Sequence, residues 1–415
     1  MAMVSAFGLM TTVAGCGLMP GDDERVTLKL VAADYGDSEA NSSRKYWDAL
    51  VEAYEKDHPN VRVDVSVHSW NDVDKKVKDM VAAGEAPDLA QVGTYADYAA
   101  AGKLYEMSEL LSIPVQANFL SSLAEAGEVD RVQYGIPFAA STRVLFYNKK
   151  LFKEAGITRA PRTWSELATD AEALKAAGVK TPYALPLGPE EAQAETMQWL
   201  LSGGAGYTDN VGTYQIDSDE NVKTFTWLKD ELVDKGLTGP ADPAKLNRAD
   251  AFSAFAGGQV GMLNGHPTLM RIAAGKGIEY GTAAMPGVDG SSHGTMGVAD
   301  WMMAFKQNGH QEEIGDFLDF VYSDENVLDF SREYNLLPVT SSASDAMAAD
   351  KDDAALRPFL EELPTSELYP VGKTSWAQVS AAVKESIGTA VGQDTDPKTV
   401  LGRLQRMAVS AENKE

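Results

Sequence analysis

The sequence predicts an α/β fold made of two domains. Patterns typical of strands and of helices alternate along the chain from residue 26 onward, and such alternation favours parallel sheets covered by helices. The chain has 415 residues, of which 44% are hydrophobic. It is therefore long enough to bury large cores and too long for a single one.

The first part of the chain is expected to form strand, helix, strand, helix and strand in turn. Valine alternates with polar residues over 61–67, which predicts a strand with one buried face. His58-Pro59-Asn60 ends the helix before it, and Gly84 ends the helix after it. The expected elements are a strand at 26–32, a helix with its apolar face over 46–54, a strand at 61–67, a helix at 73–81 and a strand at 88–92.

A second α/β unit is expected after a break at 134–138. Thr163 and Glu166 have the spacing of a capping box, so a helix is expected to start there. The expected elements are a strand at 143–147, a helix at 149–155, the helix opened by 161–166, helical texture up to 255, a turn-rich link at 285–290, a strand at 301–305, and helices at 314–322 and 325–330.

The charge balance argues against a polyanionic partner. The chain carries 36 Lys and Arg against 61 Asp and Glu, a net charge of −25. Such a protein repels phosphate backbones and anionic lipid surfaces. We therefore expect no nucleic acid among its partners.

The first 21 residues have the composition of an export signal. They contain no charged side chain and include Cys16, the one cysteine of the sequence. Val13-Ala14-Gly15-Cys16 resembles the bacterial lipobox, which implies lipid on Cys16, although no Lys or Arg precedes the apolar run. We therefore expect residues 1–25 to be a lipoprotein signal and tether that anchors the exported protein to the outer face of the bacterial cell membrane. The alternative is a buried structural cysteine.

Metal, cofactor and catalytic sites are not expected. The five histidines show no metal-ligand spacing, and one cysteine cannot build a thiolate zinc site. Residues 290–294 match the Gly-x-Ser-x-Gly pattern of serine hydrolases around Ser292, but they follow a Pro/Gly loop and not a strand. Gly372-Lys373-Thr374 lacks the earlier glycine of a phosphate-binding loop.

The order of short motifs resembles the extracellular solute-binding proteins of bacterial ABC importers, in the sugar-binding family that includes the maltose-binding proteins. The markers are residues 55–63, 86–89, 102–104, 135–137 with 147–149, 161–167, 252–258 with 261–262, and 285–287. The resemblance implies a two-lobed periplasmic-binding-protein-like fold, with a ligand cleft between lobes joined by a multi-strand hinge. One departure is that the family's tryptophan soon after Gly261-Met262 is missing, since His266 and Pro267 follow instead.

The resemblance also implies domain limits. Residues 26–140, with about 297–330, would form the N-terminal lobe. Residues 141–296, with about 331–415, would form the C-terminal lobe.

Candidate ligand-binding residues come from loops at the carboxyl ends of strands, which face the cleft in open α/β sheets, and from positions matched to the family. A sugar needs flat aromatic surface together with carboxylates and amides. The candidates are Asp34, Tyr35, Trp70, Thr94 and Tyr95 from the first lobe, Ser141 and Arg143 at the first crossing, Glu191, Gln193 and His266 from the second lobe, Asp300 and Trp301 at the second crossing, and Trp376.

Structural roles remain open for several of these. Arg143 could be an ion-pair partner, Asp300 a surface acid or helix cap, and Trp70 and Trp301 core residues. Four further tryptophans with helical spacing are expected in the cores: Trp47, Trp164, Trp199 and Trp227.

The function implied by the resemblance is capture without catalysis. The protein, a monomer without cofactor, would bind a carbohydrate, close its lobes over it and deliver it to a membrane permease. The alternatives are a receptor for a polyamine or glycerol phosphate, and a secreted hydrolase. A phosphate ligand would require clustered Arg or Lys, which the candidate loops lack in sequence.

Overall fold

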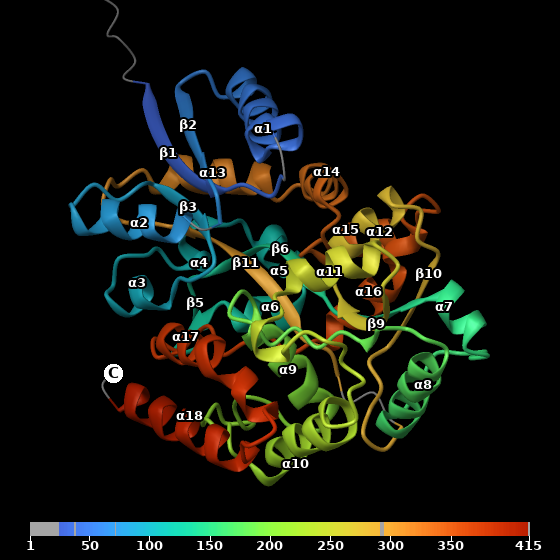
Figure 1. The fold of residues 1–415 in the computed structure, drawn as a ribbon. Coiled ribbons are helices and arrows are strands. Elements are labelled where there is room, and N and C mark those ends of the chain that lie inside the picture. Colours follow the sequence, from blue (N-terminus) through green and yellow to red (C-terminus); the bar gives the residue numbers. More distant parts are fainter. Residues whose placement is uncertain (1–24, 37–38, 71, 291–293, 414–415) are drawn as a thin grey trace, which may run out of the picture.

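Two β-sheets organise the protein, one in each lobe (Figure 1). The computed structural model describes residues 25–36, 39–70, 72–290 and 294–413. The first sheet has the order β2-β1-β3-β11-β6, and the second has the order β10-β7-β9-β8. The first-sheet strands are β1 (Val26–Ala33), β2 (Val61–His68), β3 (Leu89–Val92), β6 (Ile136–Thr142) and β11 (Gly297–Ala304). The second-sheet strands are β7 (Val144–Asn148), β8 (Thr181–Tyr183), β9 (Val260–Gly265) and β10 (Tyr280–Ala283).

The first sheet is mixed, whereas the sequence predicted a parallel one. β1 is parallel to both β2 and β3, but β11 runs antiparallel to β3 and to β6. The alternation over 61–67 is confirmed, because Val61, Val63 and Val65 are buried while Arg62 and Asp64 are exposed. A small separate sheet pairs β4 (Glu128–Val129) with β5 (Val132–Gln133).

Helices cover the first sheet where the apolar spacing predicts them. α1 begins after Ser42, whose side chain accepts a hydrogen bond from the Arg44 amide, and it buries Trp47, Leu50 and Tyr54. The helices of this lobe are η1 (Glu39–Asn41), α1 (Ser43–Asp57), α2 (Val73–Ala82), α3 (Ala96–Ala100), α4 (Met107–Leu110), α5 (Ile113–Asn118), α6 (Ser121–Ala126), α13 (Gln311–Val321) and α14 (Asp324–Tyr334).

In the second lobe, half of the predicted capping box forms. Thr163 Oγ1 accepts from the Glu166 amide at 3.0 Å, but the Glu166 carboxylate accepts from the Arg162 amide and pairs with Arg159 instead of bonding the Thr163 amide. The helices around the second sheet are α7 (Lys149–Glu154), α8 (Trp164–Ala176), α9 (Ala192–Ser202), α10 (Asp219–Trp227), η2 (Leu228–Val233), η3 (Pro243–Lys245), α11 (Arg248–Ala256), α12 (Thr268–Gly275), α17 (Trp376–Ser386), η6 (Ile387–Val391) and α18 (Pro397–Glu412).

Three passages of the chain connect the two sheets. Arg143 is the single residue between β6 and β7, and the link after β10 enters β11 at Gly297. A third passage pairs with the second, since the Gly297 amide donates to the Glu367 carbonyl at 2.8 Å. The elements between α14 and this third passage are α15 (Ser341–Ala349), η4 (Ala354–Leu356), α16 (Arg357–Glu362) and η5 (Leu363–Thr365).

The segment between α14 and the third passage packs on both sheets. The Leu337 amide donates to the Ala140 carbonyl of β6, and Phe359 contacts Phe146 of β7 with ring centroids 6.0 Å apart. α17 and α18 belong instead to the core of the second lobe. The chain therefore crosses between the lobes at adjacent places, as a multi-strand hinge requires.

No helix within the part of the chain that the structure describes combines the length and the apolar character needed to cross a bilayer. Cys16 and its motif lie outside the described residues.

Candidate ligand-binding cleft

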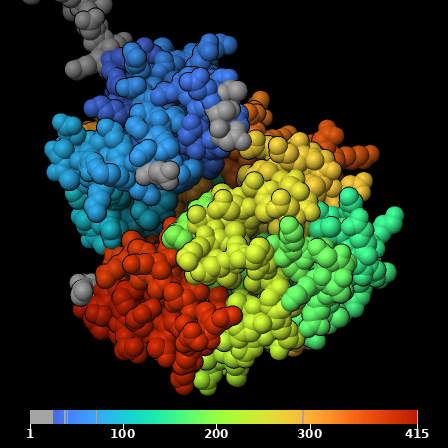
Figure 2. Space-filling model, viewed as in Figure 1, coloured from blue at the N-terminus to red at the C-terminus, as the bar shows by residue number. Residues whose placement is uncertain are grey.

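A cleft of about 530 Å³ lies where the two lobes meet. Figure 2 shows the boundary, with the blue first lobe above the red C-terminal helices and the yellow-green segment of the second lobe. Nine of the thirteen predicted residues line this cleft. From the first sheet and its loops these are Trp70, Thr94, Ser141 and Asp300. From the passage into the second lobe and beyond they are Arg143, Glu191, Gln193, His266 and Trp376.

The second-lobe wall carries a network of alternating charges. Arg143, which is 4% exposed, pairs with Glu191 Oε1. Arg248 donates a hydrogen bond from Nη2 to Glu190 Oε1 at 2.6 Å, and it forms an ion pair with Glu191, in which Nε lies 2.5 Å from Oε2. Burial alone would raise the pKa of Glu191, but the charges of Arg143 and Arg248 hold it below its ordinary value. The wall therefore presents guanidinium donors whose charge is already balanced.

This network corrects one expectation from the sequence. The loops appeared to lack clustered cations, yet the fold brings Arg143, Arg248 and Lys384 to the same cleft. Arg248 begins α11 and Lys384 lies on α17, so neither is close to Arg143 in the sequence. Two glutamates accompany the two arginines, so the cluster is not a bare cationic site.

His266 stands beside the network as a neutral ring. Burial, together with the positive charge of Arg143, lowers its pKa to about 3. Its ring centroid is 5.1 Å from that of Phe252. At physiological pH it can therefore donate or accept one hydrogen bond without adding charge.

Aromatic rings line the cleft on both lobes. Trp376 is 5% exposed and stacks on Tyr369 with centroids 5.3 Å apart and an interplanar angle of 25°. Across the cleft, Trp70 is 37% exposed and meets Tyr35 edge to face at 5.3 Å. Trp70 therefore exposes apolar ring surface on the first-lobe wall, whereas Trp376 borders the opposite wall as a mostly buried ring packed against Tyr207 and Tyr369.

Asp300 is the acid of the first-lobe wall. Its Oδ2 accepts a 2.8 Å hydrogen bond from the Tyr35 hydroxyl. The pKa of Asp300 is raised to about 7, because burial and, to a smaller extent, the charge of Asp74 raise it by more than the bond from Tyr35 lowers it. Its carboxyl group therefore changes charge near neutral pH.

Four predicted residues do not line the cleft. Asp34 holds the start of α1, since Oδ1 accepts from the Ser43 amide at 2.8 Å and Oδ2 accepts from the Ser42 hydroxyl at 2.7 Å. Burial would raise its pKa, but these bonds keep it below its ordinary value. Tyr35 lies behind Asp300 and Trp70.

The structure places Tyr95 and Trp301 in the core of the first lobe. Both are fully buried, and their rings meet at 5.2 Å. The Tyr95 hydroxyl donates to the Ala126 carbonyl at 2.5 Å. The position of Tyr95 after a strand suggested exposure, but its hydroxyl donates to carbonyls at the end of α6 and in β4, and Trp301 lies within β11 and not in a loop. Trp47, Trp164 and Trp199 are buried as expected, and Trp227 is partly buried against the second core.

Sequence reasoning missed Glu190, Arg248, Tyr369 and Lys384. The first is adjacent to a predicted residue and could have been included on that ground. Arg248 is the first residue of α11, Lys384 lies on α17, and Tyr369 lies in the loop before α17. Nothing in the neighbouring sequence marks these three residues as ligand-binding, and only tertiary packing brings them to the cleft.

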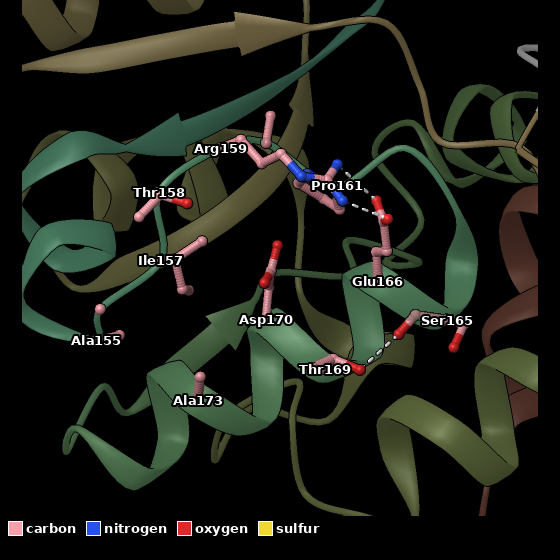
Figure 3. A pocket seen from close by; sticks show the side chains of 12 residues that line it. Ala155, Ile157, Thr158, Arg159, Pro161, Ser165, Glu166, Thr169, Asp170 and Ala173 are labelled. Atoms are coloured by element: carbon pink, nitrogen blue, oxygen red, sulfur yellow. Dashed lines mark hydrogen bonds and ion pairs between the residues drawn. The ribbon is translucent and has the colours of Figure 1, made fainter.

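A second pocket, of about 410 Å³, lies wholly on the second lobe at the start of α8. Figure 3 shows Arg159 paired with Glu166 across it, and Asp170 beside them. Because no first-lobe residue lines this pocket, it cannot respond directly to lobe closure.

Comparison with known proteins defines the family. Residues 40–328 match the model of the bacterial extracellular solute-binding protein family. The chain belongs to this family, and the predicted resemblance is confirmed.

No group of three or more potential metal-ligating side chains occurs within the described ranges.

Relatives and solved structures agree with this assignment. A binding protein of Brucella abortus (strain 2308) is 27% identical over 374 residues, covering 88% of this chain and 89% of the relative. The sn-glycerol-3-phosphate-binding periplasmic protein UgpB of Escherichia coli (strain K12) is 26% identical over 360 residues, covering 77% and 79%. The cyclic α-maltosyl-1,6-maltose binding protein of Arthrobacter globiformis superposes with a TM-score of 0.80 at 20% identity, covering 94% of this chain and 100% of that one. Maltose-bound MalE3 of T. maritima superposes with a TM-score of 0.76 at 18% sequence identity, covering 93% of this chain and 99% of that one. The two-lobed periplasmic-binding-protein fold is thus shown.

Proposed function

We propose that this solute-binding protein captures a neutral carbohydrate, an oligosaccharide in particular, by closing its lobes, and delivers it to the permease of an ABC importer. The observation that carries the proposal is the composition of the cleft. Aromatic rings lie on both walls, and both arginines of the second-lobe wall are paired with glutamates before any ligand arrives. A sugar offers C–H faces to such rings and hydroxyls to the polar groups between them.

Lobe closure supplies the mechanism of capture. Trp70 and Asp300 line the cleft from one lobe and Trp376 lines it from the other, so a ligand that contacts all three bridges the lobes. Binding therefore favours the closed form, because only that form makes both sets of contacts. Release at a permease requires no chemical change in the solute.

The alternative of a glycerol phosphate receptor is favoured by the relationship to UgpB, which is named as an sn-glycerol-3-phosphate-binding protein. The charge distribution argues against it. Arg143 and Arg248 are both engaged by glutamates, which leaves Lys384 as the one cation of the described cleft lining without an ion pair, and Asp300 faces this group from the first lobe. A phosphate dianion requires an excess of cationic donors that this balance does not supply.

A polyamine would need several free carboxylates, but Glu190 and Glu191 are already paired with arginines, so Asp300 is the one carboxyl group of the described cleft lining that is not in an ion pair. For the hydrolase alternative, Ser292 lies outside the described residues, and β10 ends at Ala283, well before Gly290. In a serine hydrolase a strand ends directly before the Gly-x-Ser-x-Gly motif and a tight turn exposes the serine, and here the described residues directly before Gly290 form no strand.

Isothermal titration calorimetry on the purified protein tests the proposal. The panel is maltose, maltotetraose and tagatose, with sn-glycerol 3-phosphate and spermidine as charged competitors. We expect one or more of the saccharides to bind and to be recovered unaltered. Tight binding of sn-glycerol 3-phosphate with no saccharide binding would refute the carbohydrate assignment, and turnover of a saccharide would refute a role limited to binding.

A lipid anchor on Cys16 remains part of this proposal. It would keep the protein close to its permease at the outer face of the membrane. Its support is the sequence motif and the extracellular character of the family.

A further inference from the structure

A hydrogen-bonded chain leads from the backbone of β1 to the cleft. The Ala33 amide donates to Gln91 Oε1 at 2.9 Å. Gln91 Nε2 donates to the Tyr35 hydroxyl oxygen at 2.7 Å, and the Tyr35 hydroxyl donates to Asp300 Oδ2 at 2.8 Å. Gln91 is fully buried, so water does not compete with these bonds.

The direction of this chain is fixed at its far end. A backbone N–H can only donate, so the carbonyl oxygen of Gln91 must face Ala33 and its NH₂ group must face Tyr35. The Tyr35 oxygen then accepts from Gln91, and its own hydrogen points to Asp300. The carboxyl group of Asp300 is thereby held by one oxygen in a set orientation.

The other oxygen of Asp300 is available to a ligand. Oδ1 has no hydrogen-bond partner among the residues that the structure describes, and the residue lines the cleft. The β11–β6 register shifts between Asp300 and Trp301. At this irregularity the two neighbouring side chains of β11 lie on opposite sides of the strand: Trp301 is buried in the core, and Asp300 lines the cleft.

The charges around Asp300 come from both lobes. Tyr35 after β1 and Asp74 of α2 face it from the first lobe. Burial raises the pKa of Asp74, and this rise is opposed by the 3.2 Å hydrogen bond from the Gly93 amide and by the charge of Lys384 on α17. The other titratable and charged residues of the described cleft lining are the paired Arg143, Glu190, Glu191 and Arg248, together with Lys384, the neutral His266 and Tyr369, whose pKa is raised by burial.

We propose that Tyr35 and Gln91 are positioning residues that hold Asp300 so that Oδ1 accepts a hydroxyl of the ligand, and that capture is coupled to loss of the Asp300 proton. This inference rests on the proposed carbohydrate function. A ligand hydroxyl donates to the ionised carboxylate and disfavours the protonated form.

The sign of the coupling follows from the pKa of about 7 for Asp300 in the ligand-free protein. Above that pH the carboxyl group of Asp300 is already ionised in the free protein, so the affinity for the ligand is at its highest. Below it, binding must first remove a proton, so affinity falls by up to about tenfold per pH unit. We expect Kd to be about tenfold weaker at pH 6 than at pH 8 if the protonated form does not bind.

The experiment measures Kd from pH 5.5 to 8.5 by calorimetry, with the saccharide of the panel that binds tightest. Titrations at pH 7 in two buffers of different ionisation enthalpy count the protons released. Tyr35→Phe keeps the ring against Trp70 but removes the bond that lowers the pKa of Asp300, so the midpoint of the pH profile should move upward. Asp74→Asn removes a charge that raises this pKa, so the midpoint should move downward.

Two variants serve as controls. Asp300→Asn should weaken binding and abolish the pH dependence. Tyr46→Phe loses a tyrosine hydroxyl that donates to the Asn326 carbonyl, away from the cleft, and should leave the midpoint unchanged. Thermal unfolding at pH 8 verifies that each variant is folded.

The outcomes separate this inference from the function beneath it. Saccharide binding with a flat pH profile, or an unchanged midpoint in Tyr35→Phe, would overturn the inference and leave the carbohydrate function standing. Absence of saccharide binding at every pH would overturn both.

Discussion

Replacing Glu191 by glutamine tests how the second-lobe wall is held together. This one carboxylate binds both Arg143 and Arg248, so the substitution removes the charge that balances them while keeping the size of the side chain. Loss of the balancing charge affects Arg143 strongly, because its side chain is only 5% exposed, compared with 24% for the side chain of Glu191. Its guanidinium is therefore largely shielded from water.

The expected magnitude follows from this burial. Removing one partner of a fully buried ion pair costs about 3–5 kcal/mol. Glu191 is partly exposed, and glutamine keeps one accepting oxygen, so we expect Glu191→Gln to lower the free energy of unfolding by about 2 kcal/mol. Glu166→Gln is the matched control, because Glu166 pairs with Arg159 on the solvent-exposed rim of the second pocket (Figure 3) and should change stability little.

Urea denaturation followed by tryptophan fluorescence measures both variants against the native protein. Equal stability of Glu191→Gln and Glu166→Gln would refute the view that the wall is a buried, mutually neutralised network. The same variant also tests selectivity. One uncompensated positive charge should improve affinity for sn-glycerol 3-phosphate by about fivefold, the effect of about 1 kcal/mol at close range in water.

Three further predictions concern other parts of the chain. Trp70→Ala should weaken saccharide binding by about 1 kcal/mol with little change in melting temperature, whereas Trp301→Ala should cost about 3–5 kcal/mol of stability; calorimetry and denaturation distinguish them, and the reverse pattern would contradict the placement of these rings. Burial raises the pKa of Glu195 from 4.5 to about 7, so its contribution to stability is complete below pH 4.5 and is lost as the pH rises through 7. Glu195→Gln should therefore raise the melting temperature more at pH 8 than at pH 5, and an equal change at both would contradict this. Cys16→Ser should release the protein from the membrane fraction without altering affinity, and its retention there would count against lipidation.

Much of the local structure could be predicted from the sequence. The β2 strand over Val61–His68 follows from alternating valines, because a period of two places them on one face. α1 ends at Asp57, before the predicted His58-Pro59-Asn60 stop, and α7 and α13 lie within a few residues of their expected ranges. These features depend on neighbours in the chain, so local spacing specifies them.

The candidate site was less accessible to such reasoning. Trp70 and Trp376 reach the cleft, yet Tyr95 and Trp301, chosen on similar grounds, are fully buried. Loop position does not say which other segments will cover a side chain. Covering elements such as α6 come from elsewhere in the chain, and the sequence alone does not place them.

By itself, the sequence determined the alternation of strands and helices, the acidic charge that disfavours polyanionic partners, and the family to which the chain belongs. Tertiary structure alone decided that Arg248 and Lys384 would join Arg143, that Glu190 and Glu191 would neutralise the two arginines, and that Tyr35 would support Asp300 from behind. The physical reason is that hydrophobic periodicity acts over a few residues, whereas a binding cleft is a set of charge and packing relations between segments that meet only after both sheets have formed.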